Sequence, residues 1–142
     1  MDGDGRIDLI AIGERSGVVI FFNNGRGGWP ESLRVDDDKA APWSIAVDDM
    51  NRDGKPDLVV ANAEVPSTVF VNNGSGRSYT RVPFGDGRGI PLAVATGDFD
   101  KDGRRDIVVA RQNAPNAVYF AGLLPTEVLY VLNVHARMRL FF

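Results

Sequence analysis

The stretch that decides the fold is DMNRDGKPD, from Asp49 to Asp57, followed directly by the apolar run LVV at 58–60. It recurs as DFDKDGRRD at 98–106, again before an apolar run, and the chain opens on the related DGDGRID at 2–8. The spacing is constant, because Asp8, Asp57 and Asp106 lie 49 residues apart. The same shift superimposes the turn NNG at 23–25 on NNG at 72–74. A repeat of this length indicates a tandem-repeat architecture with the period of propeller blades.

Each repeat is predicted to be all-β, because short β-rich runs alternate with turn residues and no 3.6-residue apolar period is long enough for a helix. In the middle unit we expect strands at 43–48, 57–62, 67–72 and 79–84, which make one blade of four antiparallel strands. The first unit supplies runs at 8–13, 17–22 and 30–35 and lacks its opening strand. In the third unit the apolar run 128–133 stands where the fourth strand is expected.

The expected organisation is therefore a partial β-propeller of about 2.5–3 blades with roughly 49 residues per repeat. Residues 1–35 form a partial blade, 36–84 a complete blade, 85–134 a third blade with a divergent end, and 135–142 an unmatched tail. Propellers normally close with about 4–8 blades, so this chain does not close a ring alone. The alternatives are a fragment of a longer chain, an assembly of copies, or an open array that self-associates through unpaired blade edges.

Composition and charge exclude several classes of function. The 142 residues carry 19 acidic against 16 basic side chains, a formal net charge of −3, which argues against broad attraction to nucleic acid or anionic lipid. No stretch reads as a membrane span. The absence of cysteine excludes disulfides and thiolate metal sites, and no secretory signal is visible because the chain opens in a polar loop.

The aspartate loops follow the pattern D-x-[DN]-x-D-G-x-x-D, which suits a hard cation. Side-chain oxygens at positions one, three, five and nine converge if the chain turns sharply at the position-six glycine, and the position-seven carbonyl adds a backbone oxygen. An all-oxygen site with several carboxylates favours Ca²⁺ over zinc or copper. The candidate ligands are Asp49, Asn51, Asp53, Lys55 and Asp57 in the middle unit, Asp98, Asp100, Asp102, Arg104 and Asp106 in the third, and Asp2, Asp4, Arg6 and Asp8 in the first.

Two calcium sites are expected in full, with a third, partial one in the first unit, where the sequence starts after position one. An EF-hand is a competing interpretation, but it needs a glutamate at position twelve, where this chain has Val60 and Val109. The simpler alternative is a set of solvated Asp-Gly turns, since Asp, Asn and Gly dominate turns for reasons of their own. Recurrence at a fixed period favours metal binding over that alternative.

At this point the units resemble FG-GAP or VCBS-type repeats, the calcium-loop blades of integrin α propellers and of many secreted bacterial proteins. The resemblance covers residues 1 to about 120 and rests on the loop, the apolar strand after it and the Asn-Asn-Gly turn. It implies calcium at the blade ends, an extracellular or cell-surface location, and a role in adhesion or in binding a protein or glycan.

An enzyme is not expected, because the sequence shows no nucleophile with a positioned base and no acid–base pair. The lone histidine, His135, lies in the unmatched tail. A non-catalytic propeller segment of a larger secreted enzyme, such as a polysaccharide-degrading protein, is the alternative function. Trp29 follows a glycine-rich turn and is expected to be exposed, where it can stack on a sugar ring, whereas Trp43, aligned with Leu92, is expected in the core.

Overall fold

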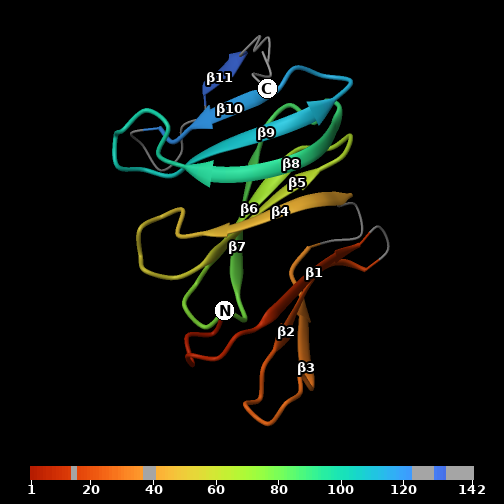
Figure 1. Cartoon of the computed structure of the whole chain (residues 1–142), viewed down its shortest axis with the longest axis vertical. Helices are drawn as coiled ribbons and strands as arrows, with labels where there is room; N and C mark the ends of the chain where they lie inside the picture. The colour runs from red at the N-terminus through yellow and green to blue at the C-terminus, as the bar shows by residue number, and fades with distance from the viewer. Residues whose placement is uncertain (14–15, 37–40, 123–129, 134–142) are drawn as a thin grey trace, which may run out of the picture.

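The computed structural model describes residues 1–13, 16–36, 41–122 and 130–133, and within these residues it is all-β and antiparallel. Three open sheets follow one another along the long axis of the molecule (Figure 1). The first contains β1 (Leu9–Gly13), β2 (Gly17–Phe22) and β3 (Glu31–Arg34). The second contains β4 (Pro42–Asp48), β5 (Asp57–Asn62), β6 (Ser67–Asn72) and β7 (Tyr79–Phe84). The third contains β8 (Ile90–Gly97), β9 (Asp106–Gln112), β10 (Ala117–Phe120) and β11 (Tyr130–Asn133).

The strand order in each sheet follows the chain. The orders are β1-β2-β3, β4-β5-β6-β7 and β8-β9-β10-β11, so every connection within a sheet joins neighbouring strands. The 49-residue shift places β5, β6 and β7 on β1, β2 and β3, and places β4 on β8. Among the described residues, the first sheet therefore has no strand equivalent to β4 and β8, as the sequence predicts.

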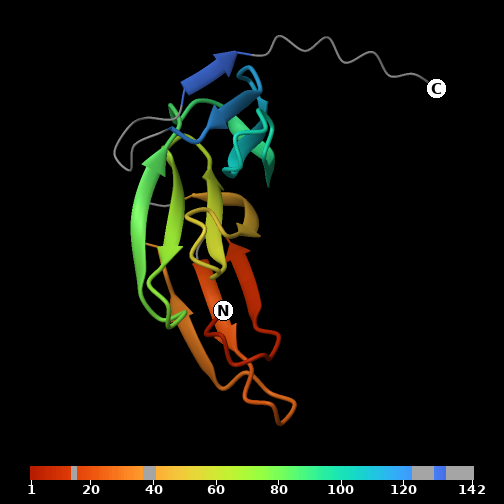
Figure 2. The ribbon, with the colours of Figure 1, turned by 90° about the vertical axis from the view of Figure 1, so that its left-hand side faces the viewer.

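The apolar core consists of two layers between the sheets, which stack face to face along the molecule (Figure 2). Between the first and second sheets the buried residues are Val18, Ile20, Phe22, Leu58, Val60 and Phe70. Between the second and third they are Val59, Ala61, Val69, Phe84, Val94, Ile107, Val109, Ala117 and Tyr119. Alternate side chains of β5 thus enter opposite layers, and all six of its residues are buried.

The strands expected in the middle unit are confirmed, with β4 beginning one residue earlier. In the first unit the expected runs are confirmed with shorter ends. The fourth strand of the third sheet is β11, although residues 128–129 lie outside the described part. The tail 135–142, with His135, also lies outside it. No helix among the described residues has the length and apolar character needed to cross a membrane.

The expected core position of Trp43 is wrong. The pairing of β4 with β5 shifts register between Pro42 and Ser44, so Trp43 stands at a bulge and its side chain is 55% exposed. Leu92 occupies the equivalent bulge between Pro91 and Ala93. A bulge re-aims the side chain of its extra residue, which is why the core position expected for Trp43 is wrong. Trp29 is 42% exposed, as expected.

Candidate metal loops

The aspartate loops connect the first two strands of the second and third sheets, and the first loop leads into β1. All three lie on the same side of the stack, at the left of Figure 1. Each loop turns where the sequence predicts, because Gly5, Gly54 and Gly103 adopt positive φ values of 79°, 80° and 83°. An L side chain is disfavoured in this conformation, so the backbone favours glycine at position six.

The aspartate at position one closes the turn. Asp98 accepts hydrogen bonds from the backbone N–H groups of Asp102 at 3.1 Å and Gly103 at 3.0 Å. Asp49 accepts the equivalent bonds from Asp53 at 3.1 Å and Gly54 at 2.8 Å. The two loops thus share one internal geometry. In each, the two oxygens of the position-one carboxylate accept hydrogen bonds from two successive backbone N–H groups.

The aspartate at position nine fastens the loop to the sheet. Asp106 is fully buried, and its two oxygens accept N–H groups from Phe99, at loop position two, and from Ala121, just beyond β10, at 2.8 and 2.9 Å. Asp57, also fully buried, does the same with Met50 at 2.9 Å and Asn72 at 2.8 Å. These carboxylates join three separate segments of one sheet.

The position-nine aspartates of the first two sheets, Asp8 and Asp57, have pKa values shifted in opposite directions. Burial raises the pKa of Asp57, and the nearby carboxylates Asp53 and Asp49 raise it further, against the lowering effect of its two backbone donors. Burial also acts to raise the pKa of Asp8, but hydrogen bonds from the N-terminal ammonium and Asn23 outweigh it and the pKa is lowered. The ammonium of Met1 stands where the N–H of Met50 stands in the second sheet.

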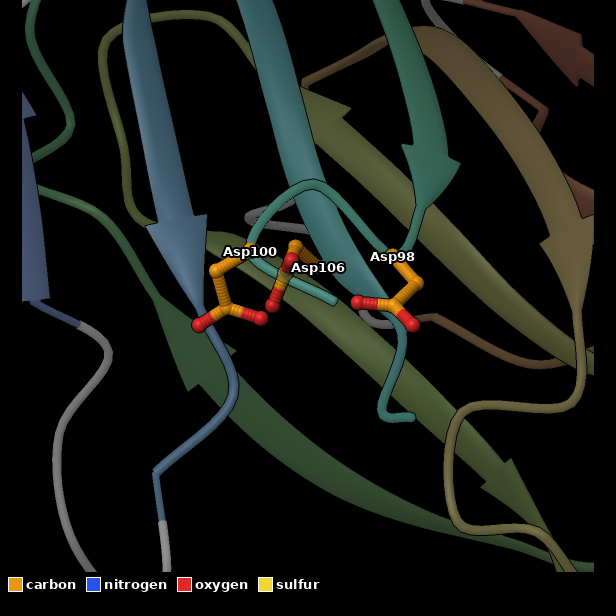
Figure 3. A group of neighbouring side chains, drawn as sticks. All are labelled: Asp98, Asp100 and Asp106. Atoms are coloured by element: carbon orange, nitrogen blue, oxygen red, sulfur yellow. The ribbon is translucent and has the colours of Figure 1, made fainter. Parts of the chain in front are cut away.

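Three of the predicted ligands of the third loop gather around one point. Oxygen atoms of Asp98, Asp100 and Asp106 lie within 4.8 Å of one another, and the three side chains converge from the loop and the start of β9 (Figure 3). Ligands on opposite sides of a calcium ion, each at 2.3–2.6 Å, stand at most about 5 Å apart. The donor set and its spacing therefore fit a hard cation. In the middle loop the equivalent positions are Asp49, Asn51 and Asp57.

The predicted position-five ligand lies outside this group. Asp102 accepts hydrogen bonds from Nε of Arg104 at 2.7 Å and from a terminal guanidinium nitrogen of the same residue, and these bonds lower its pKa. The same guanidinium donates to the carbonyl of Gly122 at 2.8 Å, which anchors it. Position five of the third loop is thus paired with a cation two residues along the chain.

This pairing recurs in every repeat. The position-seven side chains Arg6 and Lys55 form ion pairs with the position-five aspartates Asp4 and Asp53, the latter at 3.8 Å. Sequence reasoning assigned position seven only a backbone carbonyl and overlooked these ion pairs. The available signal was a basic residue at that position in all three units.

Sheets of antiparallel strands repeated every 49 residues, each fastened by a buried aspartate at the end of an acidic loop, define a tandem-repeat β protein. A family model described as an FG-GAP-like repeat matches residues 1–60 and 49–109, and the chain belongs to this family. No curated protein matches the chain at a significant level.

Proposed function

We propose that the chain is a calcium-binding module whose sheets are blades of a β-propeller, and that it binds a protein or glycan outside the cell without catalysing a reaction. The observation that carries the calcium part is the convergence of Asp98, Asp100 and Asp106 within 4.8 Å. The family match at the 49-residue period supports the propeller part, because blades are the repeating unit of that architecture.

In the third sheet the residues that would hold the ion are Asp98, Asp100 and Asp106, and in the second sheet they are Asp49, Asn51 and Asp57. Calcium at such a site supplies a double positive charge that offsets the mutual repulsion of the carboxylates. The chain's own hydrogen bonds hold the ligands in position. Asp106 presents its carboxylate at the loop because the N–H groups of Phe99 and Ala121 fix it on either side.

The ion pairs at position five are expected to weaken calcium binding at these sites. Arg104 engages Asp102 beside the three converging carboxylates, so the third loop carries its own counter-charge. That guanidinium repels a cation placed among the aspartates and competes with it for the carboxylate of Asp102. Weak affinity is the regime of extracellular calcium modules, where the ion is abundant. This agreement supports the proposed location.

Binding to a partner is proposed for the exposed apolar side chains that the core does not use. Trp29 and Trp43 are both exposed, and an indole ring can stack on a sugar or anchor a protein contact. Trp43 is the stronger candidate, because a bulge fixes the backbone beneath it.

The test is a calorimetric calcium titration of the whole chain, with thermal unfolding followed in calcium and in chelator. We expect about two sites, and each should stabilise the fold by about 2.7 kcal/mol at a calcium concentration one hundred times its dissociation constant. Asp100→Ala should abolish the third-loop site alone, whereas Glu64→Gln, an exposed acidic residue outside the loops, should leave both sites intact. Absence of binding heat, or equal losses in both variants, would refute the calcium proposal.

A further inference from the structure

A small cavity lies between the second and third sheets, at the end of the strands that is remote from the metal loops. Its volume is about 10 Å³, and Asn62 of β5 and Arg111 of β9 are among the residues that line it. The metal loops lead into Asp57 and Asp106, the first residues of β5 and β9, whereas Asn62 is the last residue of β5. The extended strand from Asp57 to Asn62 spans about 16 Å, so the cavity is separate from the loops.

One polar atom of Asn62 is buried without a protein partner. Asn62 is 6% exposed, its backbone N–H donates to Oγ of Ser67 at 3.2 Å, and its Nδ2 donates to the carbonyl of Pro66 at 3.0 Å. Its Oδ1 accepts no hydrogen bond from any residue that the structure describes. The bond to Pro66 fixes the amide, because a flip would place two oxygens against each other. Buried acceptors are almost always paired, so Oδ1 is expected to bind a donor.

The equivalent position in the third sheet is Arg111, which makes the same two contacts with its own turn. Its N–H donates to Oδ1 of Asn116 at 2.9 Å, and its Nε donates to the carbonyl of Pro115 at 2.6 Å. The guanidinium then reaches past the turn to Asp86, at 2.7 Å, in the connection between β7 and β8. The shorter side chain of Asn62 makes the turn contacts only, and Oδ1 is the polar atom that it has left for the cavity.

Three further polar side chains, Ser67, Asp86 and Tyr119, line the same cavity. The hydroxyl of Ser67 accepts the N–H of Asn62 and still has its own hydrogen to donate. Burial raises the pKa of Tyr119, the positive charge of Arg111 lowers it and the negative charge of Asp86 raises it, so the hydroxyl lies near this ion pair. A molecule in the cavity thus meets polar groups from both sheets and from the connection between them.

Size and charge decide which molecule fits. A cavity of about 10 Å³ is the smallest that holds one water molecule. A cation would be repelled by the guanidinium of Arg111, whose side chain is 5% exposed, and an anion would meet the unpaired oxygen of Asn62. The ligand must therefore be small and uncharged and must donate a hydrogen to that oxygen. Water meets all of these conditions.

We propose that the cavity binds one structural water molecule, which donates to Oδ1 of Asn62 and bonds to the hydroxyls of Ser67 and Tyr119. This water joins β5 and β6 of the second sheet to β10 of the third. At the opposite end of the strands the two sheets are joined directly, because Asp48 of β4 accepts Oγ1 of Thr96 at 2.8 Å and pairs with Arg105 at 3.2 Å. Polar contacts then hold the two sheets together at both ends of their apolar layer.

The test is oxygen-17 magnetic relaxation dispersion of the whole chain, which detects long-lived water molecules and does not respond to exchanging hydroxyl protons. A chain of 142 residues holds about five buried water molecules, so the decisive quantity is a difference between variants. Asn62→Leu keeps the size of the side chain and removes the acceptor, and we expect one long-lived water fewer. Asn116→Ser, at the exposed position equivalent to Ser67, should leave the number unchanged. Measurement in calcium and in chelator separates any water that is bound to calcium.

Two further measurements keep the test decisive if Asn62→Leu fails to fold. Ser67→Ala removes one partner of the water, and we expect its residence time to shorten. A crystal structure of the unchanged chain should place an ordered water within hydrogen-bond distance of Oδ1 of Asn62. The proposal is overturned if neither variant changes the dispersion. It is also overturned if a side chain, such as that of Arg111, donates directly to Oδ1 in the crystal.

Discussion

Replacing Asp106 by asparagine separates the two roles that the structure gives to the position-nine carboxylate. Both oxygens of Asp106 accept backbone N–H groups, and the residue is fully buried. The amide of asparagine can accept from only one of them and turns its NH₂ group toward the other donor. One charge-assisted bond worth about 1.5–3 kcal/mol is lost, the other is weakened, and a buried N–H is left without an acceptor. We expect Asp106→Asn to destabilise the metal-free chain by about 2–4 kcal/mol.

The assay is urea unfolding in chelator, followed by far-UV circular dichroism and compared with calcium titration of the same variant. Asp102→Asn is the matched control, because that residue is in the same loop but is exposed and bridges no strands. It should leave the metal-free midpoint close to that of the parent chain. If Asp106→Asn is silent in chelator and only calcium binding is lost, the carboxylate is purely a ligand and the bridging role is wrong.

Three other predictions concern the counter-charge, the core and the pH dependence. Arg104→Ala should tighten calcium binding by a few-fold in a chelator competition, because it releases Asp102; weaker binding would show that the guanidinium organises the loop. Phe70→Ala should cost about 3–5 kcal/mol in urea unfolding, since the ring is buried between two sheets, whereas the exposed Val82→Ala should change stability by less than about 0.5 kcal/mol. Burial and the negative charges of nearby aspartates raise the pKa of Tyr79 to about 12, from 10.0. Its stabilising contribution is therefore complete below pH 10 and lost as the pH rises toward 12, and Tyr79→Phe should remove that loss from a stability–pH profile.

Much of the fold was predictable because the repeat supplies three versions of the same information. The strands of the middle sheet could be placed almost to the residue, since the acidic loop and the Asn-Asn-Gly turn fix two of their ends. The burial of both faces of β5 was not predicted. It arises because this strand lies between two packed sheets and is apolar on both faces.

The errors and omissions have local physical causes. Trp43 was misplaced because a bulge inserts one residue and reverses the side on which it points, and no pattern of side chains announces that insertion. The ion pair between Asp102 and Arg104 was missed because metal-loop reasoning counts oxygens and ignores nearby cations. Spacing placed four carboxylates in the loop, but only side-chain geometry shows which three converge.

The exposure of both indoles has a practical consequence for anyone who studies this chain. Trp29 and Trp43 lie at the surface, so their fluorescence is expected to be red-shifted already in the native state and to change little when the core melts. Tryptophan emission is thus a poor probe of unfolding here. It is a good probe of contact, since a sugar or protein that covers Trp43 would shift the emission to the blue without any change of fold.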